Sequence, residues 1–175
     1  LIDSVNKTIS ESSIVPMAPI ELSLSDDEFS NALLGIGQGK VTLSPMILNI
    51  ITESVYNGGY FYTPRYVNSF ETEDVKMNKK LFSKKIIMPF SEQIANQVKD
   101  YMKEVVATGT ASGFGLKNAG GKTGTAELGN GKYNYFFTGF YENEENPKCI
   151  TIVLENCSNI GYNKTVEIFK KLLMD

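Results

Sequence analysis

The spacing of apolar residues predicts three helices in this chain. Residues 45–57 carry apolar side chains three or four positions apart, follow an N-cap serine and a proline, and stop at two glycines. Residues 91–108 and 163–174 show the same spacing. The side chains expected to face inward are Ile47, Leu48, Ile51 and Val55, then Ile94, Val98, Tyr101, Met102 and Val105, and finally Val166, Phe169, Leu172 and Leu173.

The first half of the chain has a weaker pattern. A capping-box spacing that starts at Ser25 predicts a short helix over 26–34. Aromatic residues between turn signals predict extended segments or a hairpin over 60–90, with a polar excursion at 71–80. Residues 1–24 hold little pattern and several Ser and Pro residues, so we expect them to be irregular.

The last third of the chain reads as a meander of three strands closed by the final helix. The strand candidates are 120–127, 135–141 and 149–155, separated by polar turns. The first turn contains Gly129-Asn130-Gly131, a composition typical of tight hairpins. Together with the helices, these strands predict an α+β fold with a three-stranded antiparallel sheet.

Composition narrows the chemistry. The 175 residues are 42% hydrophobic and 21% charged, which fits one globular domain, and the net charge of −3 argues against nucleic-acid binding. The chain has no histidine, which excludes His-based catalytic triads and His-ligated zinc. Cys149 and Cys157 flank one predicted strand, too far apart for a disulfide, so we expect free thiols and no structural metal site. No apolar run approaches the roughly 20 residues of a membrane span.

The sharpest candidate for chemistry is the segment 120–127, Gly-Gly-Lys-Thr-Gly-Thr-Ala-Glu. On a strand, Lys122 and Gly124 face one side, and Thr123 and Thr125 face the other. Lysine and hydroxyl groups can bind a carboxylate, glycines permit close approach of a ligand, and bare N–H groups on an edge strand can hold an oxyanion. An ordinary strand rich in Gly and Thr remains the alternative interpretation.

Two glycine loops offer rival interpretations. Residues 115–123 nearly fit the phosphate-loop pattern, but Leu116 stands where that pattern requires glycine, and Gly124 disfavours the helix that must follow. The loop 35–39 lacks the third glycine of the dinucleotide-binding pattern, because Lys40 stands in its place. Both fit simple loops.

Taken together in chain order, these segments resemble the C-terminal part of the transpeptidase domain of penicillin-binding proteins, the class B type most closely. The resemblance spans about residues 30–175 and implies a partial serine β-lactamase/D,D-peptidase-like fold. The whole chain, 1–175, is then the C-terminal lobe of that domain, with the first part of the domain absent. The segments that carry the resemblance are Gly-Ile-Gly-Gln-Gly at 35–39, Thr42-Leu43-Ser44-Pro45, Asn57-Gly58-Gly59, Pro64-Arg65, Val106 through Gly109-Thr110-Ala111, Lys122-Thr123-Gly124-Thr125-Ala126-Glu127, Phe136-Phe137-Thr138-Gly139-Phe140, and the strand 150–154.

The resemblance implies roles for four residues. Lys122 and Thr125 are expected to be catalytic: Lys122 supplies positive charge, and the N–H of Thr125 is an oxyanion-hole donor. Thr123, Gly124 and Thr125 are expected to bind substrate, with the two hydroxyls on the carboxylate of a peptidoglycan stem peptide or a β-lactam. The parent protein is then a serine-type D,D-transpeptidase that cleaves the D-Ala–D-Ala bond and needs no metal or cofactor.

The chain also departs from the family pattern of S-x-x-K, a serine–asparagine motif and K-T-G. Only K-T-G is securely present, so we expect the nucleophile to lie outside this chain and the chain alone to be inactive. Ser4-Val5-Asn6-Lys7 fits both S-x-x-K and S-x-N, but one serine cannot serve as both, and the segment lies too close in sequence to Lys122 for either motif. The tryptophan that the family usually has in the next strand is replaced here by Phe136-Phe137.

The same resemblance implies partners and a location. Partners are the peptidoglycan stem peptide and β-lactams, and the location is the extracytoplasmic face of the bacterial membrane, with an anchor outside this chain. The strand 149–154 would leave an apolar edge, to be covered by the missing part of the domain, a swapped copy or a second copy of the chain. Two alternatives remain: a β-lactam sensor or serine β-lactamase relative, and a non-catalytic scaffold with the same fold.

Overall fold

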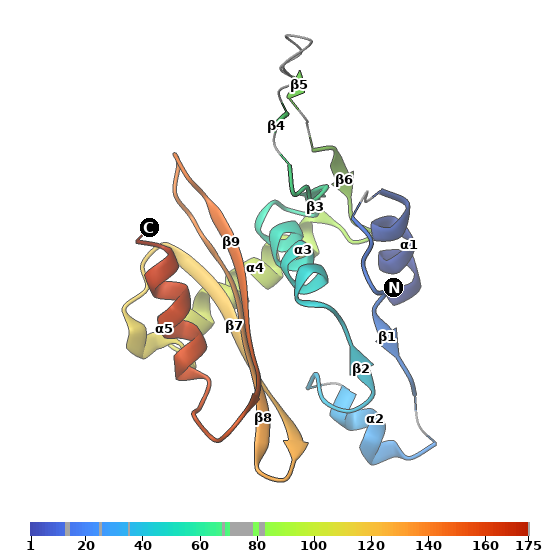
Figure 1. Ribbon diagram of the computed structural model, residues 1–175, viewed down its shortest axis with the longest axis vertical. Coiled ribbons are helices and arrows are strands. Elements are labelled where there is room, and N and C mark those ends of the chain that lie inside the picture. The colour runs from blue at the N-terminus through green and yellow to red at the C-terminus, as the bar shows by residue number, and fades with distance from the viewer. Residues whose placement is uncertain are drawn as a thin grey trace.

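The computed structural model describes residues 1–12, 15–24, 26–34, 36–67, 69–70, 79–80 and 83–174. It is an α+β fold, as the sequence predicts (Figure 1). The helices are α1 (Ile2–Ser12), α2 (Glu28–Leu34), α3 (Pro45–Tyr56), α4 (Glu92–Ala107), a short 3-10 turn η1 (Ser112–Phe114) and α5 (Asn163–Leu172). The strands are β1 (Glu21–Leu22), β2 (Val41–Thr42), β3 (Tyr60–Tyr62), β4 (Ser69–Phe70), β5 (Lys79–Lys80), β6 (Lys85–Ile87), β7 (Ala119–Gly129), β8 (Lys132–Tyr141) and β9 (Lys148–Cys157).

The main sheet is an antiparallel meander in the order β7-β8-β9, which confirms the predicted topology. The turn between β7 and β8 places Gly129, Asn130 and Gly131 in the left-handed region, which is why these residue types stand there. Helix α5 covers one face of the sheet and α3 the other, and α4 packs beside β7 (Figure 1).

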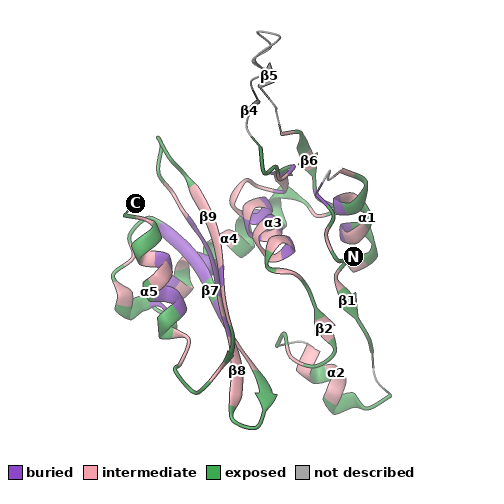
Figure 2. Cartoon of the chain, in the orientation of Figure 1, coloured by how far each residue is buried: buried purple, intermediate pink, exposed green. Residues whose placement is uncertain are grey.

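Two clusters of buried side chains hold the helices to the sheet. Figure 2 colours the buried positions along the sheet and on α3 and α5. On the α5 face, Phe137 and Phe169 are fully buried with their ring centroids 4.8 Å apart. On the α3 face, Phe140 is fully buried against Val55 of α3 and Met102 of α4. The two clusters receive alternate residues of β8, as the period of a strand requires.

The expectation of an irregular segment over 1–24 is wrong for residues 2–12, which form α1. Val5 and Ile9 are spaced four apart and are buried against α3 and the hairpin that follows it, so tertiary packing stabilises this helix. The hydroxyl of Ser12 donates to the Thr8 carbonyl at 2.6 Å. Asn6 holds the returning chain through paired hydrogen bonds to the backbone of Ile20.

The predicted inward faces of two helices need correction. In α4, Ile94 and Tyr101 are 52% and 61% exposed, and the buried residues are Ala95, Met102 and Val106. Met102 is therefore buried as predicted and Val105 packs against the core, whereas the rest of the expected stripe lies about one residue from the face that meets the sheet. In α5, Leu172 is 40% exposed, while Val166 and Phe169 are buried as expected.

Other predictions hold at the level of single elements. Helix α3 starts with Ser44 accepting a hydrogen bond from the Ile47 N–H, as predicted. The expected hairpin over 60–90 exists, with β3 paired to β6 and β4 to β5. Most of its polar excursion, 71–78, lies outside the described residues, as do Ser25 and Gly35. Helix α2 begins later than predicted, and the Asp27 carboxylate accepts a hydrogen bond from the Ser30 N–H.

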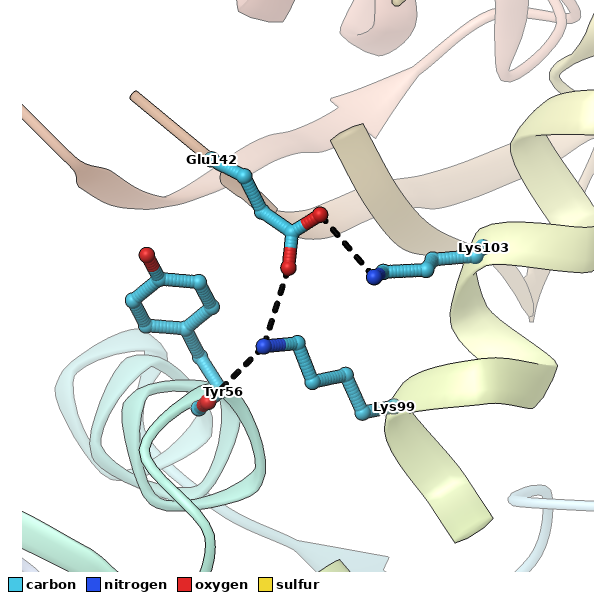
Figure 3. Close-up of polar contacts among 4 residues, drawn as sticks. All are labelled: Tyr56, Lys99, Lys103 and Glu142. Atoms are coloured by element: carbon cyan, nitrogen blue, oxygen red, sulfur yellow. Dashed lines mark hydrogen bonds and ion pairs between the residues drawn. The ribbon is translucent and has the colours of Figure 1, made fainter. Parts of the chain in front are cut away.

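A cluster of charged groups fixes α4 to the end of β8 (Figure 3). Glu142 forms ion pairs with Lys99 and Lys103 of α4, both at 2.9 Å. Lys99 also donates to the Tyr56 carbonyl at the end of α3. Partial burial alone would raise the pKa of Glu142, but the two lysines outweigh it and lower that pKa. This ion-pair cluster joins α3, α4 and the sheet.

A candidate active-site strand

Strand β7 stands at one edge of the main sheet, and its backbone pattern decides which groups are open to a ligand. The N–H of Glu142 donates to the Asn118 carbonyl at 2.7 Å, so these residues form a hydrogen-bonded pair. The register continues without a break to Glu127. Because bonded pairs alternate along an antiparallel ladder, Thr123 and Thr125 direct their N–H and C=O groups away from β8.

The Lys122 side chain is exposed and folds back along this edge. Its Nζ donates to the Thr123 carbonyl at 2.7 Å. This bond is consistent with the register, because the Thr123 carbonyl points away from β8 and is available to another donor. The ammonium group therefore lies beside the outward N–H groups of the strand. A positive charge next to bare N–H donors is an arrangement that favours an anion.

Gly120, Gly121 and Gly124 have different surroundings in the structure. A Cβ on Gly120 would lie 2.3 Å from Phe140 Cζ, and one on Gly121 would lie 2.3 Å from Phe137 Cζ. These two glycines are therefore required by the packing of aromatic rings across the strand, a role that the sequence analysis did not predict. At Gly124 the nearest atom is Phe136 Cβ at 3.3 Å, a tight contact but a milder one than those at Gly120 and Gly121.

The two threonines share the face opposite Lys122, as the strand period predicts. Thr123 is buried, with 7% of its surface exposed, and Thr125 is half-buried. The hydroxyl of Thr123 lies 2.8 Å from that of Thr110, in the loop after α4. The sequence segment Gly109-Thr110-Ala111 belongs to the family resemblance, but nothing in the sequence pairs Thr110 with Thr123.

A row of hydroxyl groups continues across the sheet from Lys122 on its α3 face. Lys122 is in register with Thr138, whose hydroxyl lies 2.7 Å from that of Thr151 and 2.6 Å from that of Thr52 on α3. Asn49 of α3 donates to Thr151 as well. These hydrogen bonds satisfy polar groups under α3 and fix that helix above the middle of the sheet.

The rival interpretations fail on the same geometry. Lys122 and Thr123 lie within a strand, whereas a phosphate loop needs a helix directly after them. In the other glycine loop, Gly37 and Gly39 adopt positive φ, and the N–H of Gln38 donates to the Leu33 carbonyl, so this loop is the C-terminal end of α2. Ser4 lies on α1, on the far side of α3 from β7 (Figure 1).

The cysteines and the possible metal ligands were the other candidates for chemistry, and we consider them in the part of the chain that the structure describes. Both cysteines are free thiols, as predicted, and burial raises the pKa of Cys149 to about 12. Among the described residues, no group of three or more potential ligands comes together to hold a metal ion. No described helix has the length and apolarity to cross a membrane.

Comparison with known proteins gives a consistent result. The family model for the penicillin binding protein transpeptidase domain matches residues 19–174. Penicillin-binding protein H of Bacillus subtilis (strain 168) is 30% identical over a match of 137 residues that covers 69% of this chain and 19% of that protein.

Solved structures agree with this family. Penicillin-binding protein A of Mycobacterium tuberculosis, in its imipenem acyl-enzyme complex, matches with a TM-score of 0.74 and 20% identity over 97% of this chain and 41% of that one. Penicillin-binding protein 2B of Streptococcus pneumoniae (strain R6) matches with a TM-score of 0.74 and 17% identity over 98% of this chain and 30% of that one. The present chain spans less than half the length of each of these relatives. It belongs to the transpeptidase-domain family of penicillin-binding proteins.

Proposed function

We propose that this chain forms one wall of a D,D-transpeptidase active site, where the edge of β7 binds a D-Ala–D-Ala stem peptide or a β-lactam. The observation that carries the proposal is the unpaired edge at Thr123 and Thr125, whose outward N–H groups lie beside the Lys122 ammonium. The acyl-enzyme complex of the M. tuberculosis relative with imipenem adds support.

Each residue has a role that its position permits. The N–H of Thr125 donates to the oxyanion that develops on the attacked carbonyl. The hydroxyls of Thr125 and Thr123 donate to the terminal carboxylate, and Lys122 stabilises negative charge at the site. Gly124 leaves room for the acyl group. No step in this scheme uses a metal or cofactor.

The acylating serine is proposed to come from a part of the parent protein outside these 175 residues. Its Oγ attacks the penultimate D-Ala carbonyl, the peptide bond breaks, and the terminal D-Ala leaves with the proton. An amine of a second stem then displaces the serine and completes the cross-link. The only S-x-x-K in this chain, Ser4 to Lys7, lies outside the residues that match the family model and is separated from β7 by α3 (Figure 1).

Labelling with a fluorescent penicillin tests the proposal. We expect the full-length protein to be labelled and the 175-residue chain not to be. Lys122→Ala in the full-length protein is expected to slow labelling by about a hundredfold, the scale of a lost transition-state contact. Lys117→Ala, which removes another exposed lysine, is the matched control. Equal labelling of the Lys122 and Lys117 variants, or labelling of the isolated chain, contradicts the proposal.

The opposite edge of the sheet, formed by β9, is where we expect another part of the parent protein to pack. Among the described residues, β9 is bonded to β8 alone, and its residues between Lys148 and Leu154 are mostly half-buried. We propose that an upstream segment of the same domain covers this edge, and that an anchor in the parent holds it on the extracytoplasmic side of the membrane. The 175-residue chain by itself is then expected to associate through β9. Light scattering that reports a stable monomer contradicts this part.

A further inference from the structure

The loop that follows α4 places a second hydroxyl at the candidate site. Thr110 Oγ1 lies 2.8 Å from Thr123 Oγ1, close enough for a short hydrogen bond between two hydroxyls. Thr110 itself is exposed, whereas Thr123 keeps only 7% of its surface open. The direction of the Thr123 hydroxyl is therefore set by a protein neighbour more than by solvent.

The backbone around Thr110 is fixed on both sides. The N–H groups of Thr108 and Gly109 both donate to the Glu104 carbonyl, and that of Ala111 donates to the Val105 carbonyl. Ala111 is fully buried. A Cβ on Gly109 would lie 2.8 Å from Val105 Cα, so only glycine lets the chain pass this close to the helix. The position of the Thr110 side chain is thus a rigid consequence of the end of α4.

A hydroxyl has one proton to donate and lone pairs to accept with. If Thr123 donates its proton to a bound carboxylate, then Thr110 must be the donor in the bond between the two hydroxyls, and the chain of two hydrogen bonds becomes cooperative. We propose that Thr110 is a positioning residue that accordingly orients the Thr123 hydroxyl toward the ligand carboxylate. This inference rests on the proposed function, in which Thr123 binds that carboxylate.

The test compares penicillin G with its methyl ester, which lacks the charged carboxylate, on the full-length protein. In Thr110→Val, the concentration of penicillin G that gives half-maximal acylation is expected to rise about tenfold, with less than about a twofold change in the saturating rate. Acylation by the ester is expected to stay unchanged. Thr110→Ser keeps the hydroxyl and is expected to restore the wild-type value.

Three results overturn the inference: an unchanged response of Thr110→Val to penicillin G, an equal loss for penicillin G and the ester, or a serine variant as impaired as the valine variant. Thr123→Val separates this inference from the proposed function. If Thr123→Val loses the preference for the carboxylate and Thr110→Val does not, only the positioning role is wrong. If Thr123→Val keeps that preference, the carboxylate role of Thr123 is wrong, and the role of Thr110 with it.

Discussion

Both ends of β7 contain glycine, but the glycines have different structural roles at the two ends. At the first end, Gly120 and Gly121 are buried under the rings of Phe140 and Phe137. At the second end, from Lys122 to Ala126, the strand turns alternate backbone groups outward and carries an exposed lysine. The comparison teaches that a glycine-rich segment is not uniform: in one part the glycines make room for aromatic rings of the core, and the other part carries the exposed lysine.

The largest expected effect is on the packed end. In Gly121→Ala the new methyl group would lie 2.3 Å from Phe137 Cζ, and Phe137 is fully buried against Phe169. We expect a loss of about 3 kcal/mol in the free energy of unfolding, the upper range for overpacking a core. Urea denaturation measures it. Gly113→Ala meets no atom within 4 Å and is the matched control, with an expected change under about 0.5 kcal/mol. Equal stability of the two variants would break the comparison.

The next effect is on the open end. In Gly124→Ala the nearest atom is Phe136 Cβ at 3.3 Å, a tight contact that a shift of a few tenths of an ångström relieves, so we expect a loss of about 1 kcal/mol, well below that of Gly121→Ala. The added methyl group obstructs the acyl group, and labelling of the full-length protein by a fluorescent penicillin is expected to fall about tenfold, equivalent to about 1.4 kcal/mol. Normal labelling, or a loss of stability like that of Gly121→Ala, would show that the two ends do not differ.

A smaller effect is expected at the ion-pair cluster that joins α4 to β8. Glu142→Gln removes a carboxylate held 2.9 Å from Lys99 and from Lys103, and we expect a loss of about 1 kcal/mol at pH 7 because the cluster is partly exposed. The pKa of Glu142 is lowered in the folded state, so its contribution is present above the ordinary carboxyl pKa and is lost as the pH falls through the lowered value. Urea denaturation at pH 7 and pH 3 should show the difference between wild type and variant at pH 7 only.

The smallest expected effect concerns the reactivity of the Cys149 thiol and involves no change in stability. Burial first, and then the nearby Glu53, raise the pKa of the Cys149 thiol to about 12, so almost none of it is thiolate at pH 8. We expect iodoacetamide to alkylate native Cys157→Ser much more slowly at pH 8 than the same variant unfolded in urea. Mass spectrometry follows the reaction. Equal rates in the two states would mean that β9 opens at the site where Cys149 meets the α3 face.

The sequence predicted the sheet well because its signals there are local. Alternating side chains and the turn at Gly129-Asn130-Gly131 determine β7 and β8 without reference to the rest of the fold. Helix α1 was missed because Ser, Thr and Asn are weak helix formers, and its burial depends on contacts with distant segments. In α4, two apolar stripes lie one residue apart, and periodicity alone does not say which one meets the sheet.

The candidate site was predicted only in part for a similar reason. Segment 122–125 was found from residue types and the family resemblance, and the alternation of its side chains follows from any strand. The different packing of Gly120, Gly121 and Gly124 depends on where two phenylalanine rings lie in the folded protein, and the sequence alone does not give those positions. Thr110 is separated from Thr123 by thirteen residues, and only the tertiary fold brings their hydroxyls together.

The packing of Phe137 over Gly121 has an evolutionary consequence. Neither position can change alone: a side chain at 121 needs a smaller residue at 137, and a smaller residue at 137 leaves a void unless 121 fills it. The two positions are therefore expected to vary together among descendants of this gene, and the pair Gly121→Ala with Phe137→Leu should be tolerated better than Gly121→Ala alone. Substitutions at this end of β7 are then expected to occur in pairs, in which a larger residue on one strand accompanies a smaller residue on its neighbour. Such paired changes leave the edge of β7 at Thr123 and Thr125 unaltered.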